Sequence, residues 1–266
     1  MARTIDQKTV DRLGERLADA YRRGDPTDPI EASVSVADGY AIQRAMLDRR
    51  EADEGPAVGY KVGFTSDAIQ EELGVDEPAY GRILADTVRS EGRLDDDGLI
   101  DPKIEPELAV RLDESLDPPV TPVDALDAAS AVVPVVEVVD SRIRDWTVDA
   151  GSAVADNALA ARVVHGDRIG DPTSLDLSLE GVAVRRNGEQ VATGVGADVL
   201  GGPARVVAWL AGALAERGER LTAGDLVSTG SLTPLVPLEP GDTVEARFAS
   251  LGTVSVARSA ARDSSP

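Results

Sequence analysis

Three glutamates in two short segments have the residue type and spacing of a divalent-cation site. Glu105 and Glu107 stand two residues apart in a segment, 103–112, that is predicted to be a strand. Side chains at i and i+2 of a strand point to the same face, so these two carboxylates emerge together. Carboxylates held this close repel each other, and a shared cation relieves the repulsion. Taken alone, the pair is better explained by a solvated acidic strand face, which is common in a chain this acidic.

The third acid changes that balance. Glu137 stands near the centre of 131–140, AVVPVVEVVD, where its neighbours are almost all hydrocarbon. An ionised carboxylate in such a strand is costly unless it is paired or bound to a metal. A salt bridge to Arg142 or Arg144 is the simpler alternative. Because the chain has no cysteine and a single histidine, His165, three carboxylates favour Mg²⁺ or Mn²⁺ with coordination sites left open for substrate, and zinc is disfavoured.

Lys61 is the natural partner of these acids. It lies in a predicted strand between apolar residues, next to Gly59 and Gly63, whose missing side chains leave room for a ligand. The only other lysines are Lys8 and Lys103, so a lysine kept here is informative. Near a metal and partly buried, its pKa should fall, which suits acid–base catalysis. The alternative is a lysine that only neutralises the carboxylates, and both roles place it at the same site.

Two helices and a set of short strands must position these residues. Helical spacing of apolar residues predicts helices over 5–23 and 36–52, and a period-two pattern begins a strand at Val58. The remaining patterns predict helices at 67–73, 123–130, 152–161 and 203–216 and strands at 103–112, 132–140, 176–186, 190–198, 225–229, 243–248 and 253–257.

This order lacks regular β-α-β alternation, which argues against a doubly wound sheet and favours an α+β fold on a curved mixed sheet. We expect residues 1–56 to form an N-terminal helical cap and residues 57–260 to form the metal-binding catalytic domain, together one compact unit. Residues 260–266 are expected to be a frayed tail.

Composition excludes several classes of partner. The chain of 266 residues has 27 basic and 48 acidic residues, a formal net charge of −21, which repels nucleic acid and anionic membranes. No apolar run approaches the roughly 20 residues that cross a bilayer, and no signal peptide is apparent, so a cytoplasmic location is expected. Abundant acid with scarce lysine is typical of proteins from salt-saturated cytoplasm, so low salt should destabilise the fold.

In combination these segments resemble the fumarylacetoacetate hydrolase superfamily, most closely its hydratase/decarboxylase branch. The resemblance runs in order from about Ala37 to Ser255. Its principal stretches are 59–66 (GYKVGFTS), 104–109 (IEPELA), 137–146 (EVVDSRIRDW), 155–158 (ADNA) and 224–231 (GDLVSTGS).

The resemblance implies a mixed β-sandwich or roll with flanking helices, and homo-oligomers built from dimers. It implies Mg²⁺ or Mn²⁺ as the metal and a small 2-oxo acid as the substrate. The site residues that it implies are metal ligands at Glu105, Glu107 and Glu137, proton transfer by Lys61, and substrate contacts at Thr65, Asp156, Thr229, Gly230 and Ser231.

Two positions bear on which reaction the resemblance implies. Hydratases of this branch usually have an Asp where this chain has Ala79, and often a hydroxyl residue where it has Leu159. Decarboxylases also lack that Asp, but the stretch from Asp140 to Trp146 is more like the hydratases. We therefore place a 2-oxopent-4-enoate hydratase ahead of a 4-oxalocrotonate decarboxylase. A catalytically degraded binding subunit is a third hypothesis, and a C–C hydrolase is disfavoured because His165 lies in the wrong segment.

Overall fold

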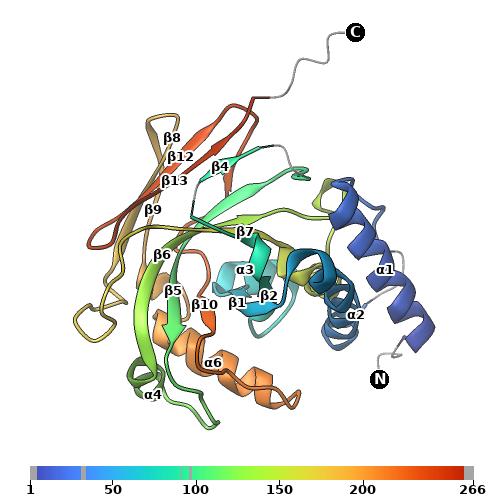
Figure 1. Ribbon diagram of the computed structural model, residues 1–266, viewed down its shortest axis with the longest axis horizontal. Helices are drawn as coiled ribbons and strands as arrows, with labels where there is room; N and C mark the ends of the chain where they lie inside the picture. Colours follow the sequence, from blue (N-terminus) through green and yellow to red (C-terminus); the bar gives the residue numbers. More distant parts are fainter. Residues whose placement is uncertain (1–4, 31–33, 91, 96–97, 261–266) are drawn as a thin grey trace.

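The computed structural model describes residues 5–30, 34–90, 92–95 and 98–260, and it shows two β-sheets, the larger of which has helices packed around it (Figure 1). The α-helices are α1 (Gln7–Arg23), α2 (Val36–Glu54), α3 (Asp67–Leu73), α4 (Pro122–Asp127), α5 (Ala150–Ala155) and α6 (Pro203–Ala215). The strands are β1 (Ala57–Gly63), β2 (Ala79–Leu84), β3 (Val88–Arg89), β4 (Arg93–Leu94), β5 (Lys103–Leu112), β6 (Ala129–Val139), β7 (Ala160–His165), β8 (Gly181–Arg186), β9 (Glu189–Val195), β10 (Leu226–Ser228), β11 (Val236–Pro237), β12 (Thr243–Phe248) and β13 (Gly252–Arg258). Four short 3₁₀ turns are η1 (Ala85–Thr87), η2 (Arg144–Trp146), η3 (Asn157–Leu159) and η4 (Gly196–Asp198).

The larger sheet carries the predicted site. It is mixed and eight-stranded, with the order β2-β1-β10-β5-β6-β7-β3, and β11 pairs with one end of β5. The long strands β5 and β6 are antiparallel neighbours near its middle, in a register that sets Glu105 opposite Glu137. The hydrocarbon-rich sequence of β6 fits this place, since most of the strand is buried. The α+β fold with a mixed sheet is confirmed.

Apolar residues fill the space on both sides of this sheet. A second sheet of five strands, in the order β4-β13-β12-β8-β9, contributes Val184, Val244, Ala246 and Phe248 to one core that also contains residues of β5 and β6. A separate core contains residues of α6, α4 and the larger sheet. The apolar residues Val206, Val207, Leu210 and Leu214 of α6 lie in this core, so the amphipathic pattern of the helix explains why it covers the sheet.

The two N-terminal helices pack on each other and on the end of the larger sheet (Figure 1). Asp6 caps the start of α1 by accepting a hydrogen bond from the Thr9 backbone N–H, and Gly24 ends the helix in the left-handed conformation. Ser35 caps α2 in the same way. Of the helices in the described residues, none is both long and apolar enough to cross a membrane.

Several elements differ from the sequence-based expectation. The helix predicted over 152–161 ends at Ala155, and residues 160–165 form strand β7 instead. Three successive residues between them, 157–159, have positive φ angles of 56°, 48° and 66°, which no right-handed helix contains. Strands β2, β3, β4 and β11 were not predicted either, and the strand predicted over 176–186 begins only at Gly181. The expected tail lies outside the described residues from position 261 onward.

Candidate metal centre and its cavity

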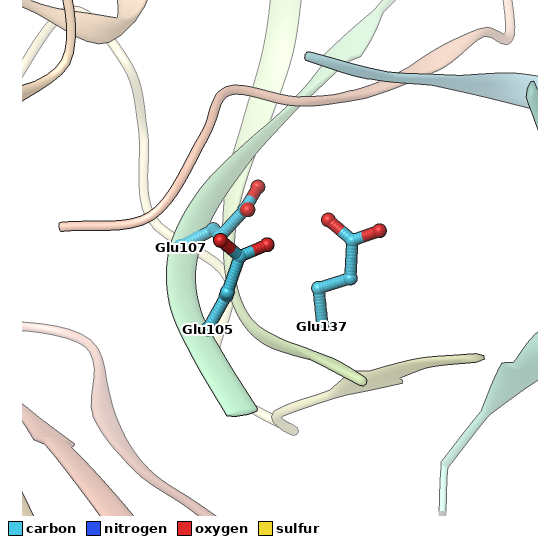
Figure 2. Close-up of side chains that lie close together, drawn as sticks. All are labelled: Glu105, Glu107 and Glu137. Atoms are coloured by element: carbon cyan, nitrogen blue, oxygen red, sulfur yellow. The ribbon is translucent and has the colours of Figure 1, made fainter. Parts of the chain in front are cut away.

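The three predicted acids converge on one point of the larger sheet. Glu105 and Glu107 project from the same face of β5, and Glu137 projects toward them from β6 (Figure 2). One carboxylate oxygen from each lies within 4.8 Å of the others. This spacing is that of oxygen ligands around a single hard cation, whose metal–oxygen distances are about 2.0–2.6 Å.

The surroundings of the acids are inconsistent with a solvated acidic face. Glu107 and Glu137 are fully buried, and Glu105 is half-buried. Both carboxylate oxygens of Glu137 and Oε1 of Glu107 lack a hydrogen-bond partner among the described residues. Burial raises the pKa of Glu137 well above its usual range, and burial together with the charge on Glu105 raises the pKa of Glu107 to about 7. Buried carboxylate oxygens that lack a hydrogen bond and converge on one point fit a cation between them.

The orientation of Glu107 is fixed by the segment that follows β10. Its Oε2 accepts hydrogen bonds from Ser228 Oγ at 2.6 Å and from the Gly230 backbone N–H at 2.9 Å. Gly230 has a φ of 102°, and a side chain there would lie 2.6 Å from Thr65 Oγ1. These contacts leave Oε1 of Glu107 available to a ligand.

Lys61 lies beside the three acids, as predicted. Its ammonium donates a hydrogen bond to the Ala158 carbonyl at 2.9 Å and forms an ion pair with Glu137 Oε1 at 3.4 Å. Arg142 pairs with Asp140 and Arg144 pairs with Asp28. The salt bridge that was the simpler alternative for Glu137 therefore involves neither arginine.

The sequence predicted that the pKa of Lys61 would fall. The protein groups around Lys61 have the opposite effect. Burial lowers the pKa of the ammonium, but the charges on Glu137, Glu105 and Glu107 outweigh burial, so the pKa is raised. The reason is that three carboxylates face one lysine. Among the protein groups alone, Lys61 is therefore a proton donor held in its charged form.

A cavity of about 780 Å³ opens over these residues. Lys61 and Glu105 lie in its wall, with Thr65 and Ser231. Most of the remaining wall is apolar and includes Phe64, Ile69, Val139, Leu159, Leu232 and Leu235. Such a space suits a small molecule with a charged end at the acids and a short hydrocarbon tail.

A second lysine and a tryptophan also line this cavity. Lys103 projects from β5 two residues before Glu105, and its Nζ lies 3.6 Å from the centroid of the Trp146 ring. Trp146, which follows the strand that carries Glu137, thus lies in the cavity wall.

The structure separates the predicted substrate contacts into two groups. Thr65 and Ser231 line the cavity, whereas Thr229, Gly230 and Asp156 are not among its lining residues. Thr229 Oγ1 donates to the Leu108 carbonyl. Asp156 Oδ2 accepts a hydrogen bond from the Arg142 backbone N–H at 2.7 Å and from Ser141 Oγ at 3.3 Å. For these three residues contact with substrate stays a prediction.

Sequence reasoning missed the side chains and carbonyls that hold the site in place. Ser228 orients Glu107, and the Ala158 carbonyl binds Lys61. Ser228 lies in 224–231, one of the segments that resemble the superfamily. A serine at the end of a strand nevertheless has no sequence feature that indicates this role. The role of Ala158 belongs to its backbone, which the sequence does not encode by residue type. His165 lies away from the cavity, with Nδ1 3.1 Å from the Gly166 carbonyl.

Known proteins are similar to this chain in sequence and fold. Residues 87–257 match the family described as fumarylacetoacetate (FAA) hydrolase C-terminal. The 4-oxalocrotonate decarboxylase of Pseudomonas putida is 39% identical over 261 residues, covering 96% of this chain and 98% of that protein. This chain belongs to the fumarylacetoacetate hydrolase superfamily. The 2-keto-4-pentenoate hydratase of Paraburkholderia xenovorans is 37% identical over 249 residues, covering 92% of this chain and 93% of that protein. The superfamily's hydratase/decarboxylase branch, named from the sequence, is thereby confirmed.

Structural similarity to that branch extends over the whole fold. The 4-oxalocrotonate decarboxylase from Pseudomonas putida G7, solved with magnesium and adipate, superposes with a TM-score of 0.91 at 37% identity. The match covers 96% of this chain and 99% of that one.

Proposed function

We propose that this chain is a lyase that requires Mg²⁺ or Mn²⁺ and hydrates 2-oxopent-4-enoate. The substrate would arrive as its dienol, 2-hydroxypenta-2,4-dienoate, and the product would be 4-hydroxy-2-oxopentanoate, as in a meta-cleavage pathway of aromatic catabolism. The observation that carries the proposal is the convergence of Glu105, Glu107 and Glu137, whose carboxylate oxygens lie within 4.8 Å of one another, beside a cavity lined by Glu105 and Lys61. Relatives named as hydratases and decarboxylases, both lyases, support the reaction class.

In this proposal Glu105, Glu107 and Glu137 hold the ion. When bound, the cation would act as a Lewis acid that stabilises negative charge developing on the substrate's C2 oxygen. The hydrogen bonds from Ser228 and Gly230 keep one oxygen of Glu107 occupied, so the other is directed at the ion.

Lys61 carries the protons. Conversion of the dienol to the conjugated ketone moves a proton from the C2 hydroxyl to C5, and hydration then adds hydroxide at C4 and a proton at C3. The Lys61 ammonium lies in the cavity wall, held by the Ala158 carbonyl and Glu137, where it can give a proton to a substrate carbon and regain one. Thr65 and Ser231 provide hydroxyl groups in the same wall, and the apolar residues accommodate C3 to C5.

Decarboxylation of 2-oxo-3-hexenedioate (4-oxalocrotonate) is the second candidate. Two observations favour it. Ala79 is buried in β2 and supplies no acid, and Lys103 adds a cation to the cavity that could bind the second carboxylate of this substrate. The same stabilisation of charge at the C2 oxygen would accept the electrons left when CO₂ departs.

Purified protein incubated with Mg²⁺ and each substrate separates these candidates. The hydratase proposal expects Mg²⁺-dependent loss of dienol absorbance without CO₂ release, and no loss when a chelator removes the ion. Release of CO₂ from 2-oxo-3-hexenedioate alone would favour the decarboxylase. No turnover of any 2-oxo acid, with an intact fold, would favour a binding subunit that has lost catalysis.

The wider setting is part of the same proposal. It places the enzyme in the cytoplasm of a salt-accumulating cell, as a homo-oligomer built from dimers, without nucleic-acid or membrane partners. Residues 1–56 are proposed as a helical cap on the catalytic unit formed by 57–260. The net charge of −21 supports the salt dependence and the absence of polyanionic partners.

A further inference from the structure

The backbone between α5 and β7 adopts a conformation that few sequences tolerate. Asn157, Ala158 and Leu159 have φ angles of 56°, 48° and 66° in succession. A single left-handed non-glycine residue is uncommon, and asparagine tolerates the conformation best. Three in a row persist only where the surrounding contacts determine the conformation, and such strain gathers at functional sites.

The Asn157 side chain supplies those contacts. Its Oδ1 accepts a hydrogen bond from the Arg82 backbone N–H at 2.8 Å, and its Nδ2 donates to the Arg82 carbonyl at 2.9 Å. The amide thus clamps both backbone groups of one residue of β2 and is itself buried. Next along β2 is Gly81, where a side chain would lie 2.3 Å from the Asn157 carbonyl. Only glycine permits this close approach of turn and strand.

The clamp lies next to Lys61. Gly81 is paired with Lys61 across β2 and β1, so the turn sits beside the strand pair that carries the lysine. The Ala158 carbonyl accepts a hydrogen bond from the Lys61 ammonium at 2.9 Å, and Ala158 and Leu159 line the cavity. A further bond, from the Asp140 backbone N–H to the Leu159 carbonyl at 2.9 Å, ties the turn to the segment after β6.

We infer that Asn157 is a positioning residue for Lys61, which rests on the proposed role of Lys61 as the proton carrier. The amide clamp holds the left-handed turn, the turn aims the Ala158 carbonyl into the cavity, and that carbonyl fixes the ammonium against Glu137. Without the clamp, Lys61 would keep its charge attraction to the acids but lose the hydrogen bond to the Ala158 carbonyl that sets its position. The three glutamates are held by β5, β6 and Ser228 and do not depend on the clamp.

The test compares Asn157→Ala and the isosteric Asn157→Asp with Asn187→Ala. Asn187, in the turn between β8 and β9, is a matched control because it too has a positive φ, 52°. Its side-chain amide donates a hydrogen bond to Asp242 and accepts one from the Thr243 backbone N–H. Both Asn157 variants should lower kcat about 10- to 100-fold, the loss expected for a misplaced catalytic group. Mn²⁺ affinity, measured by electron paramagnetic resonance, should stay within about twofold of wild type. Asn187→Ala should alter neither.

A double-mutant cycle with Lys61→Met shows whether Asn157 acts through the lysine. In the Lys61→Met background, Asn157→Ala should have no further effect on kcat. The inference is overturned by an undiminished effect of Asn157→Ala in that background, or by a loss of Mn²⁺ affinity that matches the loss of kcat. If Lys61→Met itself retains full activity, the proposed function of Lys61 fails instead.

A spectroscopic measurement makes the test independent of turnover. The chain has three lysines, so a sample labelled with ¹³C at lysine Cε gives three assignable signals. Wild-type Lys61 should show two distinct Hε shifts, as a fixed methylene does, while the exposed Lys8 shows one averaged shift. In Asn157→Ala the two Lys61 shifts should merge, and in Asn187→Ala they should not. Unchanged Lys61 signals in Asn157→Ala would overturn the inference.

Discussion

Replacing Glu137 by Gln gives opposite results for a metal ligand and for a structural ion-pair partner. Glu137 is fully buried, neither of its carboxylate oxygens has a hydrogen-bond partner in the part of the chain that the structure describes, and burial raises its pKa well above the usual range. Without an ion, its charge repels those of Glu105 and Glu107, and Lys61 balances only one of the three. Glu137→Gln removes one negative charge and keeps the shape of the side chain.

The size of the effect follows from buried-charge energetics. Removing a poorly compensated buried charge should stabilise the protein by about 1–3 kcal/mol, whereas breaking a needed buried ion pair costs about 3–5 kcal/mol. For a chain of this length, 1 kcal/mol corresponds to a Tm shift of about 2–4 °C. In a chelator, Glu137→Gln should therefore melt roughly 2–12 °C above wild type. Mg²⁺ at 100 times its Kd should stabilise wild type by about 2.7 kcal/mol and the variant hardly at all.

Differential scanning calorimetry in high KCl, with EDTA and then with excess Mg²⁺, measures both quantities. Glu189→Gln is the matched control, since Glu189 is exposed on β9 in the other sheet and its variant should follow wild type in both buffers. A Tm for Glu137→Gln well below that of wild type in EDTA, with the same rise in Tm on addition of Mg²⁺ in both proteins, would contradict this. Glu137 would then be only the ion-pair partner of Lys61 and not a metal ligand.

Three further predictions use other parts of the molecule. Burial is the main cause that raises the pKa of Asp156 from 3.8 to about 7. Because this pKa is higher in the folded than in the unfolded state, the protein loses stability as the pH rises from about 4 to 7. Asp156→Asn should therefore gain up to about 4 kcal/mol over wild type between pH 4 and 8 in urea unfolding with EDTA, and a constant difference would contradict this. Lys103→Met should raise KM about tenfold for 2-oxo-3-hexenedioate but not for 2-hydroxypenta-2,4-dienoate, and equal changes would argue against a second-carboxylate contact. The Tm of wild type should rise between low and molar KCl, because screening reduces the repulsion from a net charge of −21; a Tm that does not rise would contradict the halophilic interpretation.

Much of the site could be predicted because local patterns encode it. The i, i+2 spacing of Glu105 and Glu107 fixed their shared face, and a lone acid in the apolar strand β6 pointed to a buried charge. Strand β5 has the predicted bounds, and α6 differs by one residue at its end. Both segments have strong periodicity and clear ends, which is where sequence patterns are most informative.

The parts that escaped prediction depend on contacts distant in the sequence. The sequence predicted a helix over 152–161. The hydrogen bonds between Asn157 and Arg82, 75 residues away, hold a left-handed turn instead, and residues 160–165 form β7. The alternation at Lys61 predicted strand β1, yet Tyr60, Lys61 and Val62 are all buried, because neighbours cover both faces. The raised pKa of Lys61 likewise requires knowing that three acids face it.

The proposed function requires one divalent cation that is held by Glu105, Glu107 and Glu137 and can bind a 2-oxo acid. Electron paramagnetic resonance of Mn²⁺ titrated into purified protein in molar KCl tests this directly. One Mn²⁺ should bind per chain, 2-oxopentanoate should alter the spectrum of the bound ion, and Glu107→Gln should weaken binding by at least tenfold. Mn²⁺ that does not bind, or that binds Glu107→Gln and wild type equally, would contradict the metal centre.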